Sequence, residues 1–161
     1  MNQTRRQALK AGGNLALMGA LFATGLTRSV LAQAAEQAAA GWNPAAFATT
    51  SVDGTIKALN GTSAAQSAEI TLTAPSIAEN GAVVPITVTS NLPRTQSIAI
   101  LVEKNPNTLA AAFDLAEGTA PTVNTRVKMG QSSNVYALVK ADDKFYVTSK
   151  EVKVTLGGCG G

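Results

Sequence analysis

Residues 84–90 read VPITVTS, and in this stretch Val84, Ile86 and Val88 alternate with proline and threonine. Successive side chains of a β-strand point to opposite faces, so the alternation places the three aliphatic side chains on one face. β-Branched residues also favour the pleated conformation. The stretch therefore predicts a strand that packs one face against a core.

The same period of two residues runs from Gly61 to the end of the folded part. It recurs in Ile70 and Leu72; Ile98, Ile100 and Val102; Leu109, Ala111, Phe113 and Leu115; Val123, Thr125, Val127 and Met129; Val135, Ala137 and Val139; Phe145 and Val147; and Val152, Val154 and Leu156. Turn-forming pairs such as Asn80-Gly81, Glu117-Gly118 and Asp142-Asp143 separate the groups. About seven or eight short strands with short connections predict a mainly β fold, an antiparallel immunoglobulin-like β-sandwich, with an open barrel as the alternative.

A short helical segment is expected ahead of the strands, over residues 42–59. Asn43 is suited to cap a helix, Pro44 to occupy its first position, and Gly54 to break it in two. The larger apolar residues fit one packed face better than a ligand site: Trp42, Phe47, Ile56 and Leu59. The helical segment and the sandwich together form one expected domain over residues 42–156.

The N-terminus has the layout of a twin-arginine export signal. Arg5 and Arg6 precede a small, apolar, glycine-interrupted stretch that is shorter than the ~20 residues of a membrane span. The signal is expected over residues 1–32, with cleavage after Ala32 or Ala34, followed by a spacer over residues 33–41. The mature chain is therefore expected in the periplasm, with no membrane anchor.

Removal of this signal changes the charge of the chain. The precursor has 13 Lys and Arg against 10 Asp and Glu, and four of the basic residues lie before Ala32, so nine remain against ten, a net charge of −1. No basic surface for nucleic acid is expected on the mature protein.

The composition also argues against catalysis. The chain has no histidine and a single cysteine, so the usual general base and metal ligand are missing and no internal disulfide can form. No catalytic residue, metal site or bound cofactor is expected in this chain.

That cysteine, Cys159, stands near the C-terminus between two pairs of glycines, Gly157-Gly158 and Gly160-Gly161. Glycine samples both signs of φ and has no side chain to bury, so residues 157–161 are expected to form a flexible arm that presents the thiol. Buried cysteines usually serve packing, whereas exposed ones serve chemistry. Nothing nearby in the sequence lowers the pKa of the thiol, so any activation is expected to come from other proteins.

Several segments together resemble the SoxY family of sulfur-carrier subunits. They are residues 78–85 (AENGAVVP), residues 104–107 (KNPN), Lys128-Met129, the twin-arginine signal, the helical Trp42 segment and the terminal Gly-Gly-Cys-Gly-Gly, which is the most specific. The resemblance covers nearly the whole mature chain.

The resemblance implies a carrier that holds oxidation intermediates of thiosulfate on Cys159 and pairs with a second small β protein, SoxZ. It also implies transient contacts with a haem-containing Sox protein that joins thiosulfate to the thiol, a metal-dependent hydrolase that releases sulfate, and a molybdenum-dependent sulfane dehydrogenase. Their cofactors are not expected in this chain.

Other interpretations of the cysteine and the terminal glycines remain. Cys159 could link two chains through an intermolecular disulfide, in an exported interaction module. Sulfur could instead be held as a thiocarboxylate on Gly161, as in ubiquitin-like carriers, although the activation there needs ATP and the fold is mixed rather than all-strand. An enzyme with a cysteine nucleophile is the least favoured, because it lacks a preorganised base.

Overall fold

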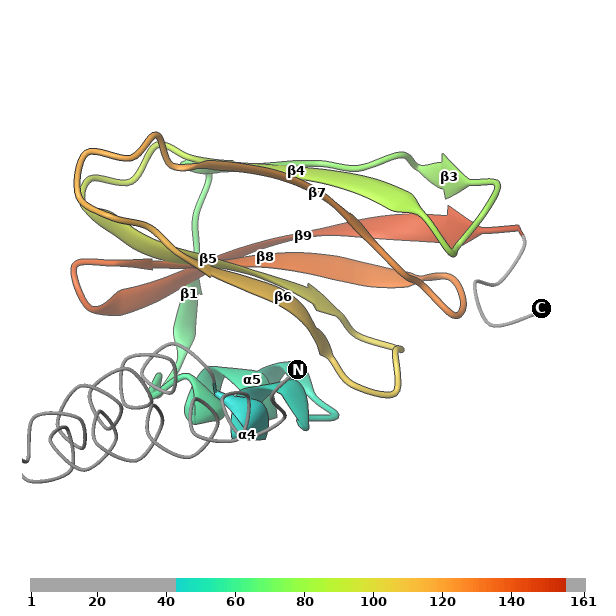
Figure 1. Cartoon of the computed structure of the whole chain (residues 1–161), viewed down its shortest axis with the longest axis horizontal. Coiled ribbons are helices and arrows are strands. Elements are labelled where there is room, and N and C mark those ends of the chain that lie inside the picture. Colours follow the sequence, from blue (N-terminus) through green and yellow to red (C-terminus); the bar gives the residue numbers. More distant parts are fainter. Residues whose placement is uncertain (1–42, 156–161) are drawn as a thin grey trace, which may run out of the picture. The chain divides into compact units, whose positions relative to one another are not determined.

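A computed structural model describes residues 43–155 of the chain (Figure 1). The predicted export signal over residues 1–32, the spacer over 33–41, Trp42, Leu156 and the arm over 157–161 lie outside the described residues. The described part falls within the domain that the sequence predicts over residues 42–156.

The helical segment contains two short helices. Helix α4 spans Pro44–Phe47, and the side chain of Asn43 accepts a hydrogen bond from the Ala46 N–H at 3.0 Å, which confirms the predicted cap. Helix α5 spans Val52–Ala58 and is capped by Ser51, whose Oγ accepts from the Gly54 N–H at 3.1 Å. The prediction of a break at Gly54 was therefore wrong, because this residue supplies the N–H that the Ser51 cap satisfies.

Nine strands follow in the described residues and form two sheets (Figure 1). They are β1 (Ala64–Gln66), β2 (Ile70–Thr73), β3 (Ile77–Ala78), β4 (Val84–Ser90), β5 (Thr95–Val102), β6 (Leu109–Asp114), β7 (Thr122–Val127), β8 (Ser133–Ala141) and β9 (Lys144–Val154). The larger sheet has the order β1-β9-β8-β5-β6, with β3 also paired to β9, and the smaller has the order β2-β4-β7. The predicted mainly β, immunoglobulin-like sandwich is confirmed.

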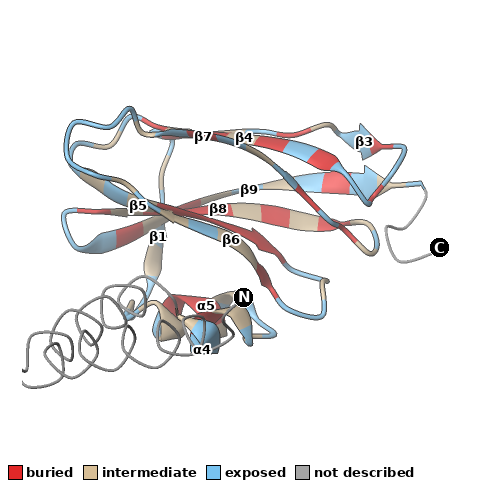
Figure 2. Ribbon diagram, viewed as in Figure 1, coloured by how far each residue is buried: buried red, intermediate tan, exposed pale blue. Residues whose placement is uncertain are grey.

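The main core lies between the two sheets. The inward-facing residues of β4 are fully buried, as the alternation in residues 84–90 predicted, and Figure 2 shows this alternation along β4. The cluster is aliphatic apart from one methionine: Ile70, Ala74, Ala78, Val84, Ile86, Val88, Ile98, Ile100, Val102, Val123, Val127, Met129, Val135, Ala137, Val139 and Val152. Burial of this surface is the main source of stability of the sandwich.

A second core lies on the other face of the larger sheet, beneath the helices. It contains Ala46, Ile56, Ala99, Leu101, Leu109, Leu138, Phe145 and Val147. The central strands β5 and β8 therefore bury residues on both faces, as strands covered on two sides do.

Strand β9 corrects the predicted strand boundaries. Phe145 with Val147 and Val152 with Val154 were predicted as two strands, but they belong to one strand of 11 residues with an unbroken register against β8. Phe145 and Val147 contribute to the helix-side core, whereas Val152 and the partly buried Val154 belong to the core between the sheets. The buried face changes along a regular strand, because helices cover only one stretch of the sheet.

Two pairings depart from the predicted antiparallel arrangement. Strands β1 and β3, too short to show a period in the sequence, both pair with β9 in parallel. Strand β3 places Ile77 opposite Lys153 and Ala78 opposite Val154, at the C-terminal end of β9. In residues 43–155, no helix is long and apolar enough to cross a membrane.

Candidate functional site

Strand β9 leads to the arm that carries Cys159, and its end is held on two sides. On one side, Lys153 N–H donates to the Ser76 carbonyl at 3.0 Å and Thr155 N–H to the Ala78 carbonyl at 3.1 Å. On the other side, Val154 N–H donates to the Ser132 Oγ at 2.9 Å. The chain is thus fixed up to the last described residue before the arm.

Thr155 makes a further contact through its side chain. Its Oγ1 donates to the carbonyl oxygen of Glu79 at 3.1 Å, although the residue itself is exposed. The backbone and the side chain of Thr155 therefore bond to consecutive carbonyls of one segment, which holds the last described residue before the arm in place.

Three connections gather at this end of the sandwich, and we call them together the arm base: residues 79–83, 103–108 and 128–132 (Figure 1). Met129 N–H donates to the Gly81 carbonyl at 2.7 Å, which joins the first to the third. The side chain of Asn105 joins the second to the third, donating from Nδ2 to the Lys128 carbonyl at 2.7 Å and accepting from the Gly130 N–H at 3.1 Å.

Local sequence explains why these connections hold their shape. Asn80 Oδ1 accepts from the Ala82 N–H at 2.8 Å, a turn in which the side chain replaces a backbone partner. Met129 is fully buried and fixes the 128–132 connection to the core. Ser133, which is also buried, accepts from the Lys104 N–H through its Oγ at 3.0 Å. Hydrogen bonds thus hold the three connections of the arm base to one another and to the sandwich.

The arm base also contains segments that carried the sequence resemblance. Residues 78–81, residues 104–107 and Lys128-Met129 are far apart in the chain, and the structure brings them together around the origin of the arm. Cys159, Gly157, Gly158, Gly160 and Gly161 lie outside the described residues, as do Arg5 and Arg6 of the signal. Their roles stay predictions.

The charges at the arm base are of both signs. Lys104 and Lys128 are exposed, as are Glu79 and Glu103, and the exposed Lys153 lies beside them at the end of β9. Asn134 Nδ2 donates to the Glu103 carboxylate at 2.9 Å. Within residues 43–155, no three His, Cys, Asp or Glu residues lie together as metal ligands do.

Two ion pairs lie at the opposite end of the sandwich, around the β8–β9 turn. Arg94 pairs with Asp142, and the Lys140 Nζ lies 3.0 Å from the Asp143 Oδ1. Two side-chain hydrogen bonds lower the pKa of the Asp143 carboxyl: the one with Lys140 has the larger effect and the one with Gln96 the smaller. The side-chain hydrogen bond between Arg94 and Asp142 raises the pKa of the Arg94 guanidinium. These groups stabilise a turn and are remote from the arm.

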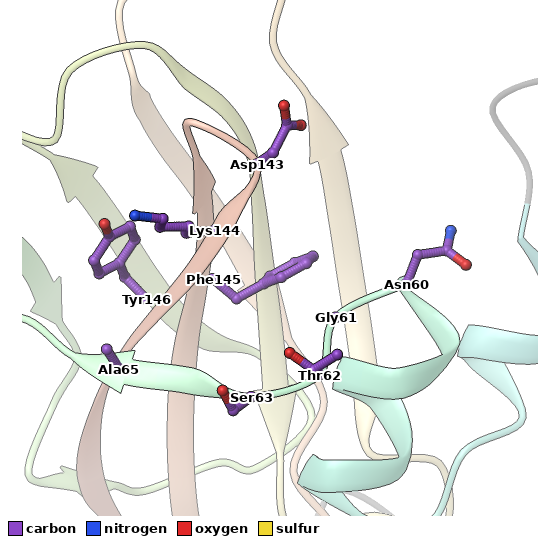
Figure 3. A pocket seen from close by; sticks show the side chains of 9 residues that line it. All are labelled: Asn60, Gly61, Thr62, Ser63, Ala65, Asp143, Lys144, Phe145 and Tyr146. Atoms are coloured by element: carbon purple, nitrogen blue, oxygen red, sulfur yellow. The ribbon is translucent and has the colours of Figure 1, made fainter.

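Figure 3 shows a pocket of about 400 Å³ near the same turn. It is lined by residues 60–63, Ala65 and residues 143–146, with the Phe145 ring pointing toward the chain near Gly61. This pocket lies at the start of β9, whereas the arm follows the C-terminal end of that strand. The pocket and the arm are therefore separate features. The carboxylate among its lining residues, Asp143, is already engaged by Lys140.

The sequence profile described as "Sulfur oxidation protein SoxY" matches residues 56–159, which is more than half of the chain and extends to Cys159. A solved structure of the sulfur carrier protein SoxY from Chlorobium limicola f. thiosulfatophilum is 36% identical. The match covers 68% of this chain and 96% of that one, with a TM-score of 0.61.

The chain belongs to the SoxY family. As a SoxY family member it has a sulfur-carrier role in thiosulfate oxidation.

Other comparisons add little to the SoxY assignment. No curated protein matches the chain. Superoxide reductase (neelaredoxin) from Ignicoccus hospitalis is 18% identical over 53% of this chain and 79% of that one, with a TM-score of 0.46. That likeness is too low to bear on function.

Sequence reasoning missed the residues that fix the origin of the arm. Ser132, Thr155 and the short strand β3 act through a few hydrogen bonds to backbone that is distant in the sequence. A serine or threonine next to a strand end carries no periodic signal, so the sequence alone could not have identified these contacts.

Proposed function

We propose that this SoxY family member carries sulfur covalently on the Sγ of Cys159 and presents it on the arm of residues 157–161. The observation that supports this most is the match to the SoxY profile, which runs to the only cysteine of the chain. The anchoring of Thr155 at the arm base adds a fixed point from which a short arm can be presented.

The chemistry follows from the thiol. In the loading step, the Cys159 thiol and thiosulfate form an S–S bond to give a cysteine S-thiosulfonate, and one proton and two electrons leave. We expect the electrons to pass to the haem-containing partner. Water then cleaves the terminal S–S bond, which releases sulfate and two protons and leaves a persulfide on Cys159. A cysteine suits this role because its S–S bonds form and break by nucleophilic exchange.

The partner enzymes supply the catalysis in this proposal. The hydrolase releases sulfate and the dehydrogenase oxidises the remaining sulfane sulfur, each with its own metal, so this chain needs no cofactor. SoxZ, the other subunit of the SoxYZ complex, is its stable partner. Arg5 and Arg6 direct export of the folded protein to the periplasm through the twin-arginine pathway, where all these steps take place.

Reconstituted loading tests the site. Purified mature complex is incubated with thiosulfate and the haem-containing partner, then digested and analysed by mass spectrometry. We expect a sulfur adduct on the peptide that contains Cys159. An adduct on Gly161 would instead indicate a thiocarboxylate carrier. Disulfide-linked dimers that do not respond to thiosulfate on non-reducing electrophoresis, without any adduct, would indicate a linked interaction module.

A further inference from the structure

A pocket of about 370 Å³ lies at the arm base, between the start of β6 and the end of β7. Arg126 and Lys128 line it, and its described lining residues include no Asp or Glu. Asn105 and Asn107 also line it, and the remaining lining residues are apolar. The pocket therefore has a positive charge, and we call it the basic pocket.

Three other pockets of the described residues each combine one cation with one carboxylate. The pairs are Lys144 with Asp143, Lys57 with Asp53, and Arg94 with Glu117. In the basic pocket no carboxylate offsets the two cations, and within residues 43–155 neither cation forms an ion pair. The basic pocket is thus suited to a negatively charged ligand from outside the described residues.

The backbone holds the two cations at a fixed spacing. Arg126 and Lys128 are exposed and alternate with the buried Val127 and Met129, so their side chains leave the same side of the chain from Cα atoms about 7 Å apart. The Asn105 Nδ2 donates to the Lys128 carbonyl at 2.7 Å, which joins the two walls of the pocket.

A small oxyanion fits this pair of cations. The Arg126 guanidinium offers several N–H donors to neighbouring oxygens, and the Lys128 ammonium adds a point charge. In the proposed loading step, the group added to Cys159 ends in a sulfonate, which has three acceptor oxygens and a negative charge. The persulfide that remains after sulfate release lacks these oxygens, so the pocket would distinguish the two loads.

The basic pocket is within range of the loaded arm. Figure 1 shows the start of β6 and the ends of β7 and β9 at the same end of the sandwich. Cys159 lies four residues beyond Thr155, so its Cα can reach about 14 Å from that residue. Lys128 lies four residues before Ser132, which gives the same upper limit, and the Ser132 Oγ accepts from the Val154 N–H at 2.9 Å. The two S–S bonds of the load, of about 2 Å each, extend the reach of the arm further.

Attachment to the chain makes a weak pocket sufficient. Exposed ion pairs contribute little to binding, so free thiosulfate should bind here only weakly. A group on a short tether has an effective concentration in roughly the mM range. The pocket can therefore hold the tethered sulfonate for part of the time and release it readily to an enzyme.

We propose that the basic pocket binds the sulfonate carried on Cys159 of the same chain, an inference that rests on the proposed function. Arg126 and Lys128 bind the sulfonate oxygens and keep the loaded arm against the sandwich between enzymes. Hydrolysis that releases sulfate removes the bound group, so the arm with its persulfide leaves the pocket.

NMR of the mature complex, with this chain labelled with ¹⁵N, tests the pocket. Tetrathionate loads the thiol without an enzyme: the Cys159 thiolate attacks an inner sulfur atom, displaces thiosulfate and keeps an S–SO₃⁻ group. Methyl methanethiosulfonate gives the control adduct, an uncharged methyl disulfide, with loss of methanesulfinate. We expect the amide signals of Asn107 and Ala110 to shift with the first adduct and not with the second. The shift should shrink at high salt.

Matched variants complete the test. Arg126→Gln with Lys128→Gln should lose the shift, and Arg126→Lys with Lys128→Arg should keep it. Lys57→Gln with Lys144→Gln, which removes two exposed cations elsewhere, should leave it unchanged. No shift, equal shifts with both adducts, or a shift that persists in the first variant overturns the sulfonate site. Loss of assembly with SoxZ in that variant also overturns it, because the pocket would then be part of the subunit interface. No adduct on Cys159 after incubation with thiosulfate and the haem-containing partner overturns the proposed function instead.

Discussion

The backbone N–H of Thr155 donates to the carbonyl oxygen of Ala78 at 3.1 Å, so the last described residue before the arm is fixed to the edge strand β3. Strand β3 pairs with β9 in parallel over only two residues, Ile77 and Ala78. A pairing this short adds little to the sheet as a whole. Its position at the end of β9 indicates that it serves to hold the point where the carrier segment leaves the sandwich.

Removal of the Ser132 hydroxyl should loosen that point. Ser132→Ala leaves the half-buried Val154 N–H without its partner, and we expect the free energy of unfolding to fall by about 1 kcal/mol. Hydrogen exchange of the Val154 amide should accelerate by more than that of the β9 centre. Ser149→Ala is the matched control, because Ser149 is exposed and lies on β9, the strand that contains Val154. It should change the free energy of unfolding by less than ~0.5 kcal/mol. Equal effects of the two variants would argue against an anchoring role of Ser132.

The arm glycines are expected to act through their lack of side chains. Gly158→Val or Gly160→Val should block enzymatic loading of Cys159 while the free energy of unfolding stays within ~0.5 kcal/mol, the usual range for exposed positions. Gly158→Ala, with a single methyl group, should fall between valine and glycine in loading rate. Loading rates of both valine variants that equal that of the unmodified protein would show that no narrow entrance limits the arm.

The helix-side core should matter for stability as much as the core between the sheets. Leu138 is 1% exposed and packs in the cluster beneath the helices. Leu138→Ala should lower the free energy of unfolding by about 2–5 kcal/mol, as other buried leucine truncations do. Urea denaturation, monitored by far-UV circular dichroism, measures this loss. A loss below about 1 kcal/mol would mean that the helices pack loosely on the sheet.

Acid should weaken the β8–β9 turn. The bonds from Lys140 and Gln96 lower the pKa of Asp143 from the ordinary 3.8. A carboxyl whose pKa is lower in the folded state stabilises the fold above the unfolded-state pKa, and that contribution is lost as the pH falls through the folded-state pKa. Asp143→Asn should therefore show a shallower loss of stability on acidification than the unmodified protein. Since Asp143 is exposed, the difference should shrink at high salt, and identical pH profiles would refute the effect.

Much of the sandwich could be predicted from alternating residues, because burial of one strand face imposes a period of two. The period in residues 84–90 and in β5 marks inward-facing residues that are indeed buried. The same rule failed on β9, where the change from Phe145 and Val147 to Val152 was interpreted as a strand end. The two buried stretches face different cores, and a change of covering element cannot be seen in a single strand.

The candidate site divides in a similar way. Cys159 and its glycines could be identified from their unusual composition, since four glycines around a lone thiol have no packing role. The arm base could not, because it depends on long-range contacts such as Met129 with Gly81 and Asn105 with Lys128. Arg126 and Lys128 likewise look like ordinary surface cations in the sequence, and only the pocket that they share distinguishes them.

The most direct test of the carrier role is mass spectrometry of the intact mature protein and its C-terminal peptide, taken from cells supplied with thiosulfate. Unmodified protein and Cys159→Ser are compared from cultures that consume thiosulfate at a measured rate. We predict sulfur adducts confined to the terminal peptide of the unmodified protein and none on the variant. Adducts that persist on Cys159→Ser, or no adduct on either protein while thiosulfate is consumed, would contradict covalent carriage on Cys159.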